Sequence, residues 1–509
     1  MGRKCVVNVD LADVFETKDR KKLLKTLAWG DEVEVIKETK THLEVVVVQF
    51  HEEQDGSIVP ERRTGFIVPR KSSGLKPADI VIPRNKNKVL KVNFVDVQQG
   101  DGSVIESPAG KIMLVDGGDN QLFARYLASR FRGTSLKKPK AIDCILVTHG
   151  DADHFVGLPE ILKSETNERA LKRLFIEPKR VYHNGIVKRP GKKGNRNRKE
   201  VELLGPTKKV GDETFIVGLE QNLLSVADDE MNGPFRVWKE TLRTYNKRAR
   251  LQLRRLEFGD DDAFDFLRDE DIKVEVLGPL ATKVSGKSAL KFLGNPPKGP
   301  RVGHESLDTD DLRTSGLSAS HTINGHSIVF RMTYGNISYL FSGDLNDEAG
   351  RLLTREHNKG ALNLKAEVFK VPHHGSADFS GAFIQSVAPI VSVVSSGDEN
   401  ARKEYIHPRA TLVGALGKWS RVPEPLVFVT ELVAFFKVED WARLIDSAKD
   451  KKRGEFFAFS RTAFGMVKTR TNGDRLLVYT DSGNVKMKEA YAYAFNDAGL
   501  LEPEVVVRA

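Results

Sequence analysis

The chain has 509 residues, of which 40% are hydrophobic and 29% charged, with a formal net charge of +10 and two cysteines. This composition is that of a globular protein with about three folding units, so it excludes global disorder and, with so little sulfur, a disulfide framework or a thiolate metal site. Apolar runs fall far short of the about 20 residues that a membrane-spanning helix needs, so we expect no membrane association and a cytoplasmic location.

The first 70 residues predict a small β-rich domain. Short apolar strands are expected at 31–36, 42–50 and 64–69, and such strands close most simply as a small β-barrel. The runs LAWGDEVEVIKE and GFIVPR resemble those of a Src-homology-3-like domain. Residues 71–88 are rich in Ser, Gly, Pro, Asn and Lys, and they predict a linker.

From residue 89 onward, apolar strands alternate with helical stretches, which is typical of an α/β domain. We expect this domain to span 89–418, with residues 159–320 as a long insertion. Residues 419–509 return to alternating strands around an Asn-Gly turn, so they predict a strand-rich C-terminal extension.

Two basic segments lie within the predicted insertion. The segment 188–199 holds seven basic residues in twelve, and it predicts either a solvated loop or an arm that neutralises phosphates. Its basic residues are Lys188, Arg189, Lys192, Lys193, Arg196, Arg198 and Lys199. In 235–258, apolar residues recur at spacings of three and four, which predicts a helix with a buried stripe and a basic side of open function.

The motif THGDADH, residues 148–154, carries the strongest chemical signal. It follows the apolar strand 142–147 and offers His149, Asp151, Asp153 and His154 as ligands within six positions. A tight loop after a rigid strand brings imidazoles and carboxylates together at little entropic cost, so the motif predicts a divalent metal site.

Three further loops are expected to complete that site. Asp344 follows the apolar strand 337–341, His373 and His374 follow a second short strand, and His407 precedes a proline. Each alone is compatible with a turn or a helix cap. Together they are what an α/β sheet provides when it builds a site along the carboxyl ends of its strands.

The ordered motifs VDVQQGDGSVI, MLVDGG, THGDADHFVGL, VEVLGP, NGHSIVFRM, FSGD, KVPHHGS and YIHP resemble the metallo-β-lactamase superfamily. More closely, they resemble the hydrolase domain of ComEC-type competence proteins. The resemblance implies an αββα sandwich of two facing mixed sheets with a metal site on their shared edge. The small N-terminal barrel-like domain and the C-terminal strand-rich extension predicted above would be attached to it.

The resemblance also implies roles for individual residues. The superfamily's HxHxDH element falls on His149, Asp151, Asp153 and His154, with Asp151 in place of the second histidine. Asp344 is then the acid that bridges two metals, and one of His373 and His374, with His373 preferred, is a further ligand. Asn324 and Ser327 stand where many members have another histidine, and His326 lies between them. One or two divalent ions, Zn²⁺ or Mn²⁺, are expected, because oxygen-rich sites suit manganese.

A bound ion lowers the pKa of water to about 7, so the predicted reaction is hydrolysis by a metal-activated hydroxide. Asp153 is expected to orient the nucleophile and His407 to act on a leaving oxygen. Lys370, His374 and Ser376 are expected to hold a substrate oxygen. With the basic segments, this predicts a phosphodiesterase or nuclease for DNA or RNA. The alternatives are a hydrolase of a small phosphorylated molecule, such as a cyclic nucleotide, and an effector subunit activated by a protein bound to either terminal domain.

Overall fold

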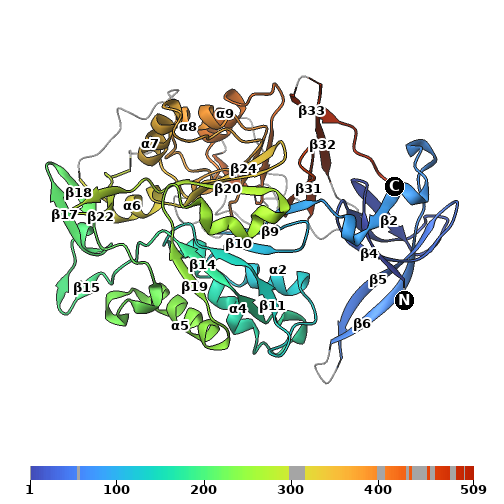
Figure 1. Cartoon of the computed structure of the whole chain (residues 1–509), viewed down its shortest axis with the longest axis horizontal. Coiled ribbons are helices and arrows are strands. Elements are labelled where there is room, and N and C mark those ends of the chain that lie inside the picture. The colour runs from blue at the N-terminus through green and yellow to red at the C-terminus, as the bar shows by residue number, and fades with distance from the viewer. Residues whose placement is uncertain are drawn as a thin grey trace.

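The structure, a computed structural model, describes residues 2–53, 58–296, 316–397, 407–431, 435–437, 456–458, 465–481, 489–497 and 499–509. Two β-sheets face each other in the central domain, and helices cover their outer sides (Figure 1). The αββα sandwich expected from the motifs is therefore confirmed. Within the described residues, no helix has the length and apolar character needed to span a bilayer.

The first sheet has ten strands in the order β19-β14-β12-β10-β9-β8-β30-β31-β32-β33. Its strands are β8 (Leu90–Phe94), β9 (Gly102–Glu106), β10 (Ile112–Asp116), β12 (Cys144–Leu146), β14 (Arg180–His183), β19 (Gln252–Arg255), β30 (Met466–Thr471), β31 (Arg475–Asp481), β32 (Ala490–Phe495) and β33 (Leu501–Glu504). Strands β10, β12, β14 and β19 run parallel, so their carboxyl ends meet at one edge.

The second sheet has six strands in the order β20-β23-β24-β25-β26-β27. They are β20 (Ile272–Gly278), β23 (Val329–Tyr334), β24 (Ile337–Phe341), β25 (Val368–Lys370), β26 (Val391–Val394) and β27 (Leu426–Val429). From β24 to β27 the strands are parallel, which again gathers carboxyl ends at one edge.

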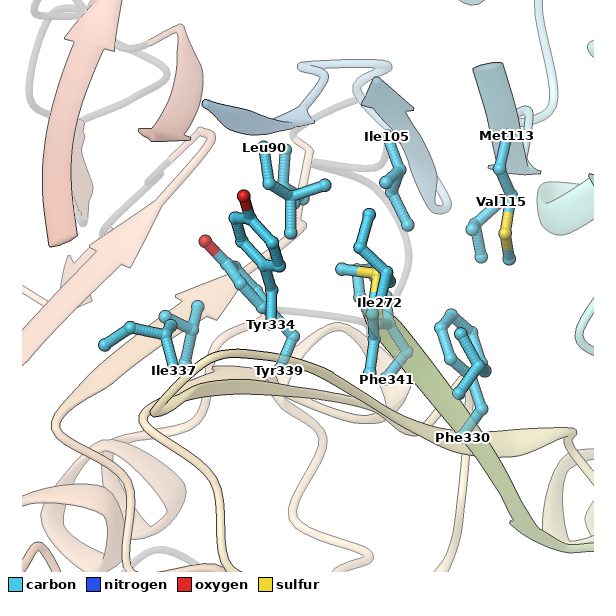
Figure 2. Packing of buried hydrophobic residues seen from close by; sticks show 14 of the residues in the cluster. Leu90, Ile105, Met113, Val115, Ile272, Phe330, Tyr334, Ile337, Tyr339 and Phe341 are labelled. Atoms are coloured by element: carbon cyan, nitrogen blue, oxygen red, sulfur yellow. The ribbon is translucent and has the colours of Figure 1, made fainter. Parts of the chain in front are cut away.

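Alternate side chains of the facing strands form the core between the sheets. Leu90, Ile105 and Met113 point from the first sheet toward Phe330 and Phe341 of the second (Figure 2). The rings of Phe330 and Phe341 stack with centroids 4.6 Å apart. These two rings are cross-strand partners within the second sheet, and Phe94 of β8 stacks on Phe341 across the interface between the sheets, with centroids 5.9 Å apart.

Helices pack on the outer faces of both sheets (Figure 1). Helices α2 (Leu122–Arg130), α4 (Leu158–Ser164) and α5 (Gly233–Arg248) cover the first sheet, and α7 (Asp347–Asn358), α8 (Gly381–Val387) and α9 (Ala410–Lys418) cover the second. The predicted apolar stripe of α5 is buried from Phe235 to Tyr245. The helix ends at Arg248, earlier than expected, because Ala249 is extended and the chain continues into β19.

The segment 159–320, expected as an insertion, supplies strands of the sandwich itself: β14, β19 and β20. Its remaining described strands form small separate sheets, one of them with β11 from before the segment, and a further pair lies near the C-terminus. These are β11 (Lys140–Ile142) with β13 (Ile176–Pro178), β15 (Lys192–Lys193) with β16 (Arg196–Asn197), β17 (Thr207–Val210) and β18 (Glu213–Ile216) with β21 (Thr282–Val284) and β22 (Lys287–Lys291), and β28 (Phe435–Lys437) with β29 (Phe456–Ala458).

The N-terminal region forms an antiparallel sheet in the order β3-β2-β6-β5-β4-β1-β7. Its strands are β1 (Arg3–Val7), β2 (Leu11–Phe15), β3 (Leu23–Ala28), β4 (Glu32–Glu38), β5 (Leu43–Glu52), β6 (Ile58–Ile67) and β7 (Val81–Pro83). The expected linker 71–88 thus contains α1 (Pro77–Ile80) and β7, which pairs with β1.

The C-terminal residues join the other parts of the chain. Strands β30 to β33 extend the first sheet from β8, and β27 extends the second. Ala509 is buried against the N-terminal sheet, where its backbone N–H donates to the Leu11 carbonyl at 2.9 Å. The predicted C-terminal extension is therefore an integral part of the sandwich and of its contact with the N-terminal sheet.

Candidate metal centre

The candidate site lies where loops from both sheets meet at the carboxyl ends of their parallel strands. The loop 148–154 follows β12, and α3 (Ala152–Phe155) begins inside it. Asp344 follows β24 of the opposite sheet, and His374 follows β25. The topology therefore brings together side chains that are up to 225 positions apart in the sequence, because parallel strands end at one edge.

Among the described residues, three overlapping groups of side chains have ligand atoms within 4.8 Å of one another. One joins His154 to Asp101 and Asp116. The other two, which hold the predicted ligands, are His149, His154 and Asp344, and Asp153, His154 and His374. Asp344 lies close to both groups, since its carboxylate oxygens are 3.1 Å from His154 Nε2 and 3.3 Å from His374 Nε2. The His149 Nε2 atom lies 3.9 Å from Asp344. An acid shared in this way can serve two neighbouring cation positions.

The donor atoms fit a divalent ion. The Nε2 atoms of His149, His154 and His374 and Oδ1 of Asp344 are buried, and none of the four makes a hydrogen bond in the structure. Buried polar atoms without partners are costly, so their convergence on one point indicates an additional ligand. Zn²⁺ and Mn²⁺ both bind imidazole nitrogen and carboxylate oxygen. Either ion would be held here by His149, Asp153, His154, Asp344 and His374.

Burial and charge set the protonation of these groups. Burial, reinforced by the charge of His154, lowers the pKa of His149 to about 3, so His149 is neutral at pH 7. Burial opposes the charge of Asp344, but the imidazoliums of His154 and His374 outweigh it and hold the pKa of Asp344 well below its usual value. In His154, burial is outweighed by Asp344 and Asp116, and the pKa is raised well above its usual value. Without an ion, protons on two histidines balance the carboxylates. Metal binding must displace those protons.

Two carboxylates behind the ligands hold the imidazoles in place. Asp116, at the end of β10, accepts from His154 Nδ1 at 2.9 Å, and also from the Thr148 backbone N–H and hydroxyl. His374 Nδ1 donates to the Ser395 carbonyl at 3.1 Å, and Asp101 lies 3.4 Å from the same nitrogen and 2.7 Å from the ammonium of Lys370. Such partners fix the ring orientation and tautomer of metal-binding histidines.

Neither Asp101 nor Asp116 was assigned a role from the sequence, although both stand in the quoted motifs. For Asp116 the available signal was the one that identified Asp344, an acid at the end of an apolar strand, whereas Asp101 precedes its strand, β9. Gln99 was also missed, and its side-chain amide donates to Asp153 at 3.0 Å. Sequence alone offered no sign that a glutamine would support the loop.

Gly100 allows the loop before β9 to approach the metal loop closely. Its φ is +99°, and a Cβ at this position would lie 1.8 Å from the Asp153 carbonyl oxygen. Only glycine fits such a contact in such a conformation. The close approach places Gln99 and Asp101 beside the ligands.

The structure distinguishes between the two adjacent histidines. His374, rather than the preferred His373, has its Nε2 in a ligand group. His373 Nε2 lies 3.4 Å from Asn324 Nδ2, and its ring lies 6.2 Å from that of His407. His373, Asn324 and His407 therefore form a polar wall beside the ligands.

Other predicted site residues have structural partners. His326 lies outside both ligand groups, and its Nε2–H donates to the Lys291 carbonyl at 2.7 Å. The Ser327 hydroxyl accepts from the Asp344 backbone N–H, and the Ser376 hydroxyl accepts from that of Asp378. Lys370, expected to contact substrate, is 3% exposed and paired with Asp101, so it supports the ligands from behind.

Most of the basic segment 188–199 is paired with acids. Arg189 and Arg198 bond Glu230, Arg196 bonds Glu202, and Lys193 lies 3.5 Å from Glu230. Lys192 is exposed and has no ion pair among the described residues. In the second basic segment, the guanidiniums of Arg243, Arg248, Arg254 and Arg255 also contact carboxylates. These contacts reduce the charge that either segment offers to a polyanion.

Two facing sheets between helical layers, with a histidine and aspartate cluster at their common edge, are the arrangement expected of a metallo-β-lactamase fold. The model of the metallo-beta-lactamase superfamily matches residues 95–220, which include the whole metal loop.

The chain is also similar to ComE operon protein 3 of Bacillus subtilis (strain 168), with 24% identity over 344 residues, 65% of this chain and 31% of that protein. It is 37% identical over 86 residues to competence protein ComA of Neisseria gonorrhoeae, 17% of this chain and 12% of that protein. The chain thus spans less than a third of the length of either relative. These similarities support a ComEC-type protein of the superfamily.

Proposed function

We propose that the chain is a metal-dependent phosphodiesterase that cleaves DNA or RNA. The observation that carries the proposal is the convergence of four buried donor atoms without hydrogen bonds, at His149, His154, His374 and Asp344. A divalent ion bound there would lower the pKa of a water molecule and polarise a phosphate oxygen. The similarity to a competence protein favours a polyanionic substrate, and so does Lys188, a partly exposed lysine that contacts Asp151 of the metal loop.

The chain's own residues would position the reactants. Gln99 orients the Asp153 carboxylate, Asp116 holds the ring of His154, and the Ser395 carbonyl holds the ring of His374 beside Asp101. Burial, followed by the charges of His374 and His373, lowers the pKa of His407 to about 3. His407 is therefore a neutral imidazole at pH 7, and it suits a hydrogen bond to a substrate oxygen rather than a charge contact.

The test is cleavage of labelled single-stranded and double-stranded DNA and RNA by the Mn²⁺-loaded chain. Asp153→Asn and His149→Ala should abolish the fragments, whereas Asp229→Asn, a change at an exposed acid outside the metal loop, should leave them. Cleavage that survives both site changes would mean that another site or a contaminant is responsible. Turnover of a cyclic nucleotide with no turnover of polymer would instead support the small-molecule hydrolase.

A further inference from the structure

Asp151 occupies a ligand position of the metal motif, but its carboxylate has a different partner. It lies in the same loop as His149, Asp153 and His154, yet it is absent from both groups of close ligand atoms. Its Oδ1 instead accepts from the ammonium of Lys188 at 3.0 Å. Asp151 is in the extended conformation immediately before α3, which sends its side chain away from those of its neighbours.

A hydrogen bond to its backbone carbonyl fixes the position of Lys188. Its carbonyl accepts from the Asn232 backbone N–H at 2.9 Å, and the Asn232 side chain caps α5 by accepting from Phe235 N–H. The Phe235 ring packs against Phe155 of the metal loop, with centroids 4.8 Å apart. Helix α5 thus fixes the lysine relative to the ligands.

The pair spans the rim of the site. The Asp151 side chain is 18% exposed and that of Lys188 is 33% exposed, so both reach solvent and the lysine does so more. A lysine ammonium has three N–H donors, and Asp151 accepts from one of them. Among the described basic residues of 188–199, Lys188 is the one whose partner belongs to the metal loop.

We propose that Asp151 and Lys188 form a substrate-binding pair: Asp151 holds the Lys188 ammonium at the rim, where it binds a phosphate oxygen, and Asp151 is no metal ligand. This inference rests on the proposed phosphodiesterase. The buried acids of the site repel an approaching phosphodiester, and a fixed cation at the rim offsets that repulsion. An aspartate anchor orders the flexible lysine before the substrate arrives, which lowers the entropic cost of binding.

The metal part of the proposal is tested without any substrate. In calorimetric titrations, Asp151→Asn and Lys188→Ala should bind the same number of Mn²⁺ ions per chain as wild type. Their Kd for Mn²⁺ should change by less than about threefold. His154→Ala should lose metal. If Asp151→Asn binds one Mn²⁺ ion fewer than wild type, or binds Mn²⁺ with a Kd raised tenfold or more, Asp151 is a metal ligand and the proposal is overturned.

The substrate part is tested by fluorescence anisotropy with a 5′-labelled single-stranded oligonucleotide and the Mn²⁺-loaded full chain at a temperature where cleavage is slow. Lys188→Ala should weaken binding by about five- to tenfold, Lys188→Arg should restore most of it, and Asp151→Asn should give an intermediate loss. The matched control is Lys209→Ala, an exposed lysine of β17.

Equal binding by wild type and Lys188→Ala, with metal retained, would overturn this inference while leaving the hydrolase proposal intact. A wild-type chain that holds metal and oligonucleotide but never cleaves would count against the hydrolase proposal alone. A wild-type chain that holds metal but binds no oligonucleotide would overturn both.

Discussion

The carboxylate of Asp116 lies 2.9 Å from Nδ1 of His154, and the opposite nitrogen of that ring faces Asp344 at 3.1 Å. One ring thus links an acid at the end of the first sheet to an acid at the end of the second. Because Asp116 accepts the Nδ1 proton, the Nε2 lone pair is free for a metal.

Replacing Asp116 with asparagine should weaken Mn²⁺ binding by about 10- to 100-fold, because the ring of His154 loses the acceptor that fixes its tautomer. Calorimetric titration measures this change. The exposed Asp229→Asn should bind as wild type does. Unchanged affinity in Asp116→Asn would show that His154 is no ligand or needs no support.

Gly100→Ala should disrupt the metal loop, whereas Gly110→Ala should not. Both glycines have positive φ, so alanine costs about 1 to 2 kcal/mol at either position. A Cβ at Gly100 meets the Asp153 carbonyl, but one at Gly110 meets nothing within 4 Å. Only Gly100→Ala should therefore lose metal affinity as well as stability. Equal behaviour of the two variants in metal titration and thermal unfolding would contradict this geometry.

Removal of metal should lower the free energy of unfolding. An ion present at 100 times its Kd stabilises the folded chain by about 2.7 kcal/mol, because it binds the assembled ligands and not the unfolded chain. Thermal unfolding with and without EDTA measures the difference. His154→Ala should unfold at the same temperature in both buffers, and a wild-type chain that did the same would have no such site.

Stability should fall in acid through Glu106. Burial would raise its pKa, but Arg130 and Lys91 outweigh burial and lower it to about 2. Because the pKa is lowered on folding, the stabilisation is complete above the unfolded value of about 4.5 and is lost as the pH falls toward 2, an effect on the order of 3 kcal/mol. The free energy of unfolding of Glu106→Gln, measured in urea, should therefore change less between pH 5 and 3 than that of wild type. The exposed Glu489→Gln should follow wild type, and parallel curves for all three chains would refute the assignment.

The hairpin of β15 and β16 remains predicted to contact nucleic acid through its lysines. Changing Lys192 and Lys193 together to alanine should reduce the slope of log K against log salt by about 1 to 2. Arg198→Ala should instead destabilise the fold, because its side chain is 5% exposed and paired with Glu230. If the salt slope of the double variant is unchanged, the hairpin is a solvated surface that does not contact nucleic acid.

Much of the site could be predicted from the sequence, because its ligands lie in short motifs directly after apolar strands. The loop 148–154, Asp344 and the His373-His374 pair were all found in this way. Strand alternation and the helical stripe beginning at Phe235 likewise predicted local structure and burial. These signals are local, since side chains within a few positions of a strand end share its direction.

Tertiary structure alone decided which of those side chains converge. Spacing could not show that His374 turns inward and His373 toward Asn324, or that Asp151 pairs with Lys188, 37 positions away. It also could not show that β14, β19, β20 and the C-terminal strands complete the two sheets. Such choices depend on packing and charge pairing between distant segments, and those energies exist only once the chain has folded.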